Sequence, residues 1–285
     1  MSASAIGEAN GGVTDAIRSL PGKTVGLPAG PSRVGALIVN ADDWGRDRET
    51  TDRALECVQR GAVSSVSAMV FMQDSERAAA LAIGHGIDAG LHLNFTTAFS
   101  GIQVPGALSE QQDRLARYLR HKASRVVFHP GLIAPFEYVV AAQIQEYFRL
   151  YHARPERLDG HHHMHLCSNV VFTGLLPPGT IVRRNFSFRP GQKSVWNRLY
   201  RRSVDRALSR RHRLTDFFFS LDPLESPDHV RAILSLAKDF IVEVETHPIS
   251  PREYAFLANR RLLRWDGDAP VAARYALAGA SLPAQ

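Results

Sequence analysis

Nine residues near the start of the chain, Leu37-Ile38-Val39-Asn40-Ala41-Asp42-Asp43-Trp44-Gly45, decide the fold. An apolar run that ends in polar side chains is typical of a strand in a parallel α/β protein. In such proteins the loops after the strands face one common side and carry the active site. We therefore expect the first strand of an α/β domain to deliver both aspartates, Asp42 and Asp43, to a site.

Two further apolar runs end in the same way. Ala89-Gly90-Leu91-His92-Leu93-Asn94 delivers one histidine, and residues 240–248 deliver His247 just before Pro248. Each motif alone has an ordinary structural explanation: a turn or helix cap for the aspartates, a hydrogen-bonded core histidine for His92, a proline-fixed strand end for His247. The joint pattern favours one shared site.

The segment Asp159-Gly160-His161-His162-His163-Met164-His165 places four histidines in seven residues. Neutral imidazole is the commonest side-chain ligand for a divalent transition metal. The segment is internal and has helix-like sequence on both sides, unlike a purification tag. If it is extended, alternation puts Asp159, His161, His163 and His165 on one face and His162 on the other. We expect a metal site here, with a polar strand end as the alternative.

The rest of the chain alternates between strand and helix patterns. Strands that alternate with helices indicate right-handed βαβ units and a parallel sheet. About seven units fit an irregular or incomplete (β/α) barrel, which is TIM-barrel-like; a Rossmann-like open sheet is the alternative, but no G-x-G-x-x-G follows the first strand. Helices are expected near 48–60, 74–84, 108–121, 136–152, 168–176, 193–210 and 227–236. Strands are expected at 36–41, 64–71, 88–95, 180–185, 215–221 and 239–246, and one more strand is expected to end at the His-rich segment.

Domain organisation and composition agree with one globular protein. We expect a flexible extension over residues 1–34, one barrel domain over 35–265, and a C-terminal tail over 266–285 whose order the sequence leaves open. Of the 285 residues 45% are hydrophobic and 22% are charged, as in ordinary globular proteins. No run of 18 apolar residues and no secretory leader are visible, and two cysteines make no disulfide framework, so the cytoplasm is the expected location.

Four motifs together resemble those of the YdjC-like carbohydrate deacetylases, a family that includes chitooligosaccharide and hopanoid-associated deacetylases. The motif N-A-D-D-F-G is similar to residues 40–45, with Trp44 in place of Phe. G-x-H-L-x is similar to 90–94, D-S-H-x-H-x-H to 159–165 with Gly160 in place of Ser, and H-P to 247–248. The motifs follow the family order over residues 36–248. The resemblance implies the same barrel fold and metal-dependent removal of an N-acetyl group from an amino sugar, with release of acetate.

The resemblance also implies roles for single residues. Asp43, His92 and His161 would bind one divalent metal ion, Mg or Zn, while Asp42 would be the general base and His247 the general acid. A hydrolytic site of this kind keeps about three protein ligands and leaves a position for water, whose pKa the metal lowers. The water must lose a proton and the departing amine must gain one, which requires the two further groups.

Other residues are candidates for supporting roles. A carboxylate such as Asp159 is expected to orient a ligand histidine. His163 and His165 would line the substrate pocket or complete a hydrogen-bond network, and Arg183 and Trp44 are further candidates beside the metal or the substrate. Cys167 is more typical of a small buried hydrophobe than of a metal ligand.

The net charge of +6 is concentrated in one region, residues 183–213, which holds eleven Arg or Lys and a single acid, Asp205. Residues 193–211 have the pattern of an amphipathic helix with a cationic face. One interpretation is a barrel helix with its apolar side on the core and its arginines in water. The other is contact with an anionic membrane surface or a phosphate-bearing, lipid-linked sugar. Nucleic acid is an unlikely partner because the aromatic residues lie on the apolar face. The expected apolar residues are Trp196, Leu199, Tyr200, Val204 and Leu208.

Two functions from other classes stay open. The same ligands would serve another metallohydrolase, such as a phosphoesterase, or a metal- or sugar-binding protein without catalysis. The presence of both Asp42 and His247 argues against a non-catalytic site.

Overall fold

The computed structural model describes residues 35–188, 192–224, 227–259, 272 and 274–275. The expected extension over 1–34 and most of the expected tail over 266–285 therefore lie outside the described residues. Among the described helices, none combines the length and the apolar character needed to cross a bilayer.

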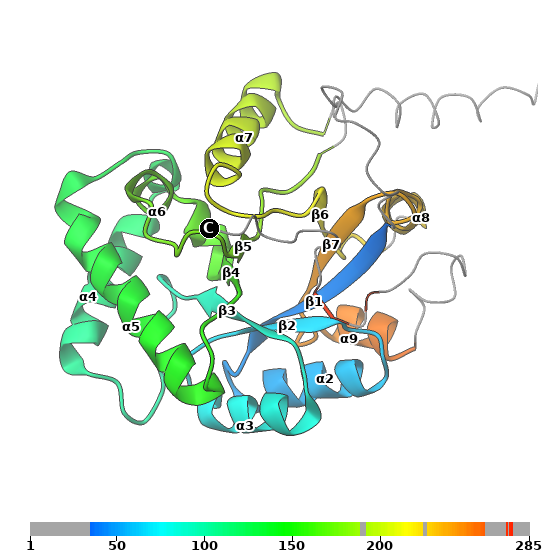
Figure 1. Ribbon diagram of the computed structural model, residues 1–285, viewed down its shortest axis with the longest axis horizontal. Helices are drawn as coiled ribbons and strands as arrows, with labels where there is room; N and C mark the ends of the chain where they lie inside the picture. The colour runs from blue at the N-terminus through cyan, green and yellow to red at the C-terminus, as the bar shows by residue number, and fades with distance from the viewer. Residues whose placement is uncertain (1–34, 189–191, 225–226, 260–271, 273, 276–285) are drawn as a thin grey trace, which may run out of the picture.

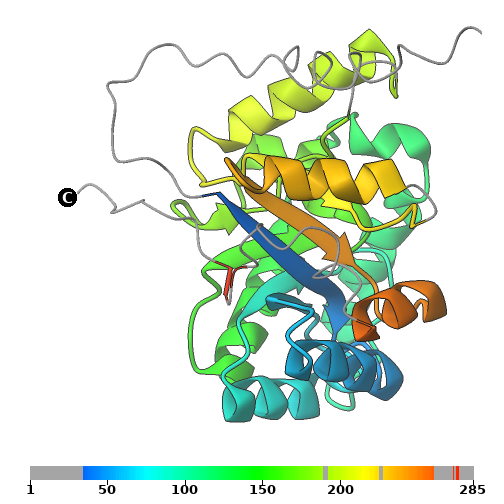
Figure 2. The ribbon, with the colours of Figure 1, turned by 90° about the vertical axis from the view of Figure 1, so that its right-hand side faces the viewer.

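Seven parallel strands form one curled sheet, a half-barrel flanked by helices (Figure 1). The order across the sheet is β5-β4-β3-β2-β1-β7-β6, so that β1 pairs with β7, which lies next to the edge strand β6; Figure 2 shows β1 and β7 side by side, in blue and orange. The predicted incomplete barrel of seven parallel strands is confirmed. The strands are β1 Ala36–Trp44, β2 Ser65–Ala68, β3 Ala89–Leu93, β4 Arg157–Gly160, β5 Ile181–Val182, β6 Phe217–Ser220 and β7 Ile241–Thr246.

All seven helices expected from periodicity are present among the described residues, with small shifts at their ends. They are α2 Arg48–Gln59, α3 Ser75–His85, α4 Gly106–Leu119, α5 Ile133–Tyr151, α6 Ser168–Thr173, α7 Val195–Leu208 and α8 Pro227–Leu236. An eighth helix, α9 Pro251–Ala258, was not expected. It begins at a proline, which fits the first helical turn because that position needs no N–H. The described part of the chain also contains three short 3₁₀ segments: η1 Lys122–Arg125, η2 Pro130–Leu132 and η3 His161–Leu166.

The sheet has an apolar outer face and a polar inner face. Val39 and Val244 belong to the large core cluster that also contains residues of α2, α3, α5 and α8. The alternate positions carry polar side chains, and the register places Asn40 opposite Glu245. Since successive side chains point to opposite faces, these polar residues line the inside of the half-barrel.

A small apolar layer closes the end of the half-barrel where the strands begin. Ile38, Ile181 and Ile241 pack there with Tyr275 in a cluster of their own. The hydroxyl of Tyr275 donates to Glu243 Oε2 at 2.6 Å, and its ring centroid lies 4.4 Å from the Arg157 guanidinium carbon. Apolar side chains thus close the polar interior at the end where the strands begin.

The structure corrects two expectations. The His-rich segment is not extended, because β4 ends at Gly160 and both His162 and His163 have left-handed backbones, with φ of 55° and 58°. The predicted alternation across this segment is therefore wrong. The apolar side of α7 is also only partly on the core: Val204 and Leu208 are buried, while Trp196, Leu199 and Tyr200 are exposed.

Candidate active site

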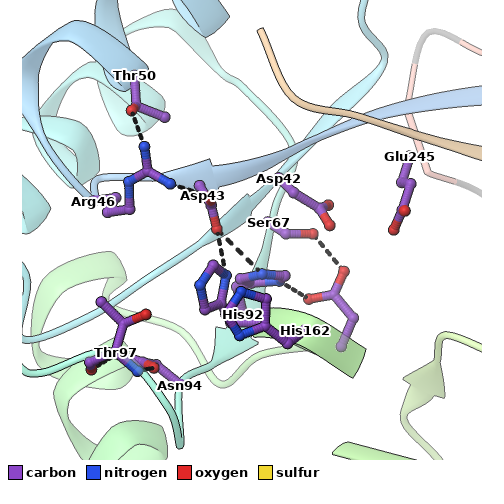
Figure 3. Close-up of polar contacts among 12 residues, drawn as sticks. Asp42, Asp43, Arg46, Thr50, Ser67, His92, Asn94, Thr97, His162 and Glu245 are labelled. Atoms are coloured by element: carbon purple, nitrogen blue, oxygen red, sulfur yellow. Dashed lines mark hydrogen bonds and ion pairs between the residues drawn. The ribbon is translucent and has the colours of Figure 1, made fainter. Parts of the chain in front are cut away.

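A bulge near the end of β1 brings its two aspartates to one site. Strand alternation would carry Asp42 and Asp43 to opposite faces. The β1–β2 register shifts between Ala41 and Trp44, and Asp43 has a left-handed φ of 65°. A bulge of this kind re-aims side chains, and it turns Asp43 toward His92 (Figure 3).

Three buried side chains from three strand ends converge on one point. Asp43 Oδ1 lies 2.8 Å from His161 Nδ1 and 3.5 Å from His92 Nε2. Although both nitrogens face it, this buried oxygen accepts no hydrogen bond from the described residues. One ligand atom from each residue lies within 4.8 Å of the others. An unpartnered carboxylate oxygen facing two imidazoles suits a divalent metal ion, so these three residues could hold one.

The electrostatics of this cluster favour a positive charge. Burial would raise the pKa of Asp43, but His161 and His92 beside it hold that pKa far below its usual value. Burial would lower the pKa of His92, but Asp159 and Asp42 outweigh it and raise the pKa to about 10. The surrounding carboxylates that stabilise a proton on His92 would equally stabilise a cation at the same place.

Asp159 fixes the orientation of His92. Its Oδ1 lies 2.8 Å from His92 Nδ1, which leaves Nε2 facing Asp43. Its Oδ2 accepts from Ser67 Oγ at 2.5 Å and pairs with Arg183 at 2.8 Å. A carboxylate bonded to the far nitrogen of a metal-binding histidine is the usual support for such a ligand. A second group, Asp42 with His92 and Asp159, also brings ligand atoms together, but both its carboxylates are bound to Arg183.

Arg183 is the centre of a buried network of carboxylates and is only 1% exposed. It donates to both oxygens of Asp42, at 2.7 and 2.8 Å, and from Nε to Glu243 at 2.7 Å. Its Nη1 also lies 3.5 Å from Glu245 Oε2. Burial would lower the pKa of this guanidinium, but Asp159, Asp42 and Glu243 raise it well above its usual value. A permanently charged arginine therefore neutralises part of the acidic interior.

Asp42 is held as a carboxylate by three donors. In addition to the two bonds from Arg183, Asn40 Nδ2 donates to its Oδ1 at 2.8 Å. Burial would raise the pKa of Asp42, but the Arg183 charge outweighs burial and lowers it. The group is therefore ionised and fixed in orientation.

The remaining candidates lie at different distances from this centre. His163 Nε2 faces Glu245 Oε2 at 3.5 Å, and His165 Nε2 donates to the Arg183 carbonyl at 3.0 Å. Burial lowers the pKa of His165 to about 3, so it is neutral. Trp44 is fully buried and donates to the Ala78 carbonyl at 3.2 Å, which places its indole in the core against α3.

His247 follows β7 directly and is half-buried. Its backbone N–H donates to Glu253 Oε2 at 2.8 Å. Among the described residues, no hydrogen bond, ion pair or ring contact joins its side chain to the three proposed metal ligands. Cys167 is buried, and burial raises the pKa of its thiol to about 11, which disfavours the thiolate that a metal would need.

Sequence reasoning missed several polar residues of the interior. Glu243 and Glu245 alternate along an otherwise apolar strand, and that alternation was a usable sign of an inward polar face. No pattern in the sequence indicated that Arg157 lies in the polar interior. Its guanidinium occupies the space beside Gly90, where an added Cβ would lie 2.8 Å from it, and donates to Asn40 Oδ1 at 2.9 Å.

Fold and site together define an α/β incomplete-barrel protein with a buried two-histidine, one-aspartate centre at the carboxyl ends of its strands. Residues 36–259 match the model of the YdjC-like protein family, and the chain belongs to this family. The resemblance seen in the four motifs is thereby confirmed.

Curated relatives agree with this assignment. The carbohydrate deacetylase of Danio rerio is 28% identical over 54% of this chain and 50% of its own length. The carbohydrate deacetylase of Geobacillus stearothermophilus is 32% identical over 47% of this chain and 51% of its own length. The chitooligosaccharide deacetylase of Escherichia fergusonii is 30% identical over 46% of this chain and 50% of its own length. The chain thus spans about half the length of these relatives.

One similar solved structure supports the fold alone. It is described as a "putative cellobiose-phosphate cleavage protein" from Enterococcus faecalis V583. The two share 18% identity and a TM-score of 0.59, over 85% of this chain and 98% of that one.

Proposed function

We propose that this protein is a metal-dependent hydrolase that removes an N-acetyl group from an amino sugar or oligosaccharide and releases acetate. The convergence of Asp43, His92 and His161 is the observation that carries the proposal. The names of the relatives, carbohydrate deacetylase and chitooligosaccharide deacetylase, indicate the class of substrate.

Asp43, His92 and His161 would hold the metal ion. Two imidazoles and one carboxylate are donors that suit zinc or another transition metal better than magnesium, which prefers oxygen ligands. When bound there, the ion would supply Lewis-acid polarisation of the acetamide carbonyl and of the attacking water. The bond from Asp159 to His92 keeps one ring nitrogen aimed at the site.

Two further residues would move the protons. The water oxygen adds to the acetyl carbon, the C–N bond breaks, and the amine leaves with a proton while the acetyl group becomes acetate. Asp42 would take the proton from the water, since Arg183 and Asn40 fix its carboxylate in the ionised form. His247, at the end of the neighbouring strand β7, would protonate the amine.

The deciding experiment is a screen for acetate release over neutral and charged N-acetylated sugars, combined with elemental analysis of the purified protein. We expect release from at least one amino sugar, one metal ion per chain, and loss of that ion in His161→Ala. His162→Ala, the exposed neighbour, is the matched control and should keep the metal. Hydrolysis of phosphate esters without acetate release would support the phosphoesterase instead, and stoichiometric metal with no turnover would support a binding protein.

A further inference from the structure

A tight turn after β1 folds the side chain of Arg46 back onto Asp43 (Figure 3). The N–H of Arg46 donates to the Asp43 carbonyl at 3.0 Å, which closes a four-residue turn. Gly45 makes this turn possible, because its φ of 87° is one that residues with side chains rarely adopt. Arg46 Nη1 then donates to Asp43 Oδ2 at 2.6 Å. The proposed proton transfers do not involve this bond.

The two side-chain oxygens of Asp43 therefore have different surroundings. Oδ1 lies 2.8 Å from His161 Nδ1 and 3.5 Å from His92 Nε2, and it accepts no hydrogen bond from the described residues. Oδ2 is bound to Arg46. Rotation of the carboxylate would bring Oδ2 toward the histidines only if the bond to Arg46 broke. The bond thus leaves a single oxygen of Asp43 facing the imidazoles.

Arg46 is itself anchored to the start of α2. Its Nε donates to Asp47 Oδ2 at 3.0 Å and its Nη2 to Thr50 Oγ1 at 3.3 Å. Asp47 is the N-cap of α2, where its Oδ1 accepts from the Thr50 N–H at 2.8 Å. A guanidinium carries five N–H donors in a planar fork, so one side chain can bind all three partners at once. The end of the helix fixes the arginine, and the arginine fixes the Asp43 carboxylate.

We propose that Arg46 is a positioning residue for the metal ion, because it holds Asp43 with Oδ1 alone facing His92 and His161. The inference rests on the proposed metal centre and adds a residue that supports its carboxylate ligand, as Asp159 supports His92. A carboxylate that gives one oxygen to an ion leaves more of the ion's coordination positions for water and substrate.

Orientation and charge predict opposite results when Arg46 is removed. A guanidinium beside Asp43 repels a second cation, so a purely electrostatic role predicts tighter metal binding in its absence. A positioning role predicts weaker binding, because the freed carboxylate must be ordered again when the ion binds. The sign of the change in metal affinity therefore decides between the two roles.

Titration of the metal-free full chain with cobalt(II) chloride, followed by calorimetry and visible absorption, measures this change without turnover. Cobalt(II) accepts imidazole and carboxylate ligands, and its visible bands report their number and geometry. The test variant is Arg46→Gln, and Arg77→Gln is the matched control. The Arg77 side chain is 31% exposed against 28% for Arg46, and it pairs with Asp74 at the N-cap of α3. Among the described residues, no hydrogen bond or ion pair joins Arg77 to a proposed metal ligand.

We expect Arg46→Gln to weaken cobalt binding roughly 10- to 100-fold, the usual effect of losing the partner of a metal ligand. The visible spectrum should also change, because Asp43 is then free to present either oxygen or both. Arg46→Lys keeps the charge without the fork and should recover part of the affinity. Arg77→Gln should bind cobalt like the unmodified chain. Unchanged or tighter binding in Arg46→Gln, or an equal loss in the two glutamine variants, would overturn the inference.

Two further outcomes have a definite reading. If Arg46→Gln does not fold, Asp47→Asn takes its place, because asparagine keeps the helix cap and loses the ion pair with Arg46. Weaker cobalt binding in that variant supports the inference, and unchanged binding contradicts it. If the unmodified chain binds neither cobalt, zinc nor magnesium, the proposed metal centre fails and the role of Arg46 fails with it. If the unmodified chain binds cobalt and Arg46→Gln binds it equally well, only the role of Arg46 is wrong.

Discussion

Arg183 has the most carboxylate partners of any residue described in the interior. Replacing it with methionine would leave Asp42, Asp159 and Glu243 buried without their cation, a loss that typically costs about 3–5 kcal/mol. Arg183→Lys should keep the positive charge without the forked geometry of the guanidinium, and so should retain only part of the stability lost in the methionine variant. Urea unfolding measures the effect, with the exposed Arg202→Met as control; a loss as small as that of the control would contradict the network's role in stability.

The metal content of variant proteins should distinguish the proposed proton-transfer residues from the proposed metal ligands. Asp42→Asn and His247→Ala should each lower the rate of acetate release roughly 10²–10⁴-fold, the usual range for general acid–base groups, and keep the metal. Glu245→Gln is the informative comparison, because Glu245 Oε2 is buried with no hydrogen bond from the described residues. If Glu245→Gln loses activity and Asp42→Asn keeps it, Glu245 is the base. Loss of metal in Asp42→Asn would exchange the roles of the two aspartates.

His165 should make stability depend on pH. Its pKa is about 3 in the folded protein because of burial, against about 6.5 when unfolded. Between these values the unfolded chain binds the extra proton, so stability falls as the pH falls below 6.5 and is unaffected above it. This residue alone should cost about 2 kcal/mol between pH 7 and pH 5. His165→Gln should flatten that slope in urea titrations; an unchanged slope would contradict the assignment.

Single residues differ in how far sequence could predict them. Asp43 and His92 were candidates because each ends an apolar run, and His161 because it lies in the His-rich segment; their roles as metal ligands came from the family resemblance and stay a prediction. The direction of the Asp43 side chain could not be predicted from the sequence, since it depends on a bulge and a left-handed backbone. Tyr275 was also unpredictable, because its partners Glu243 and Arg157 are distant in sequence and come together only in the folded barrel.

At the scale of elements, periodicity located the helices and failed at the His-rich turn. Alternation assumes an extended backbone, and two consecutive histidines with left-handed backbones break it; neither position is a glycine, the residue that usually marks such a conformation. Gly160 contributes to this turn, because a Cβ there would lie 3.1 Å from the backbone nitrogen of His165. The same turn separates the side chain of His161, which faces Asp43, from that of His162, which lies beside Thr96.

Helix α7 carries a prediction of its own. Trp196 is 81% exposed at the start of a helix rich in arginine, so the described structure leaves this part of its apolar side in solvent. If this surface meets anionic lipid, as in the second interpretation of the basic region, the chain should co-sediment with anionic vesicles at low salt and release at high salt. Trp196→Ser should weaken binding and leave stability unchanged. No co-sedimentation even at low salt would leave the solvated-helix interpretation.

At the scale of the whole molecule, the sealed end of the half-barrel depends on a residue far from the sheet in sequence. Tyr275→Phe keeps the ring over Arg157 and removes only the hydrogen bond to Glu243 Oε2. A buried acceptor left without its donor costs about 1–3 kcal/mol. Thermal unfolding should show that loss, and acetate release should persist below the transition. Tyr254→Phe, which removes a more exposed hydroxyl, is the control.

The pairing of β1 with β7 has a consequence for how the chain is made. Ala36 and Ile241 are partners although they lie about 200 residues apart, and contacts of such long sequence separation slow folding. During synthesis β1 leaves the ribosome long before its partner exists, so the edge that β7 will cover stays open for most of translation. A nascent chain arrested before residue 240 should therefore remain protease-sensitive at β1 and bind chaperones, and release of β7 should abolish both within one folding time.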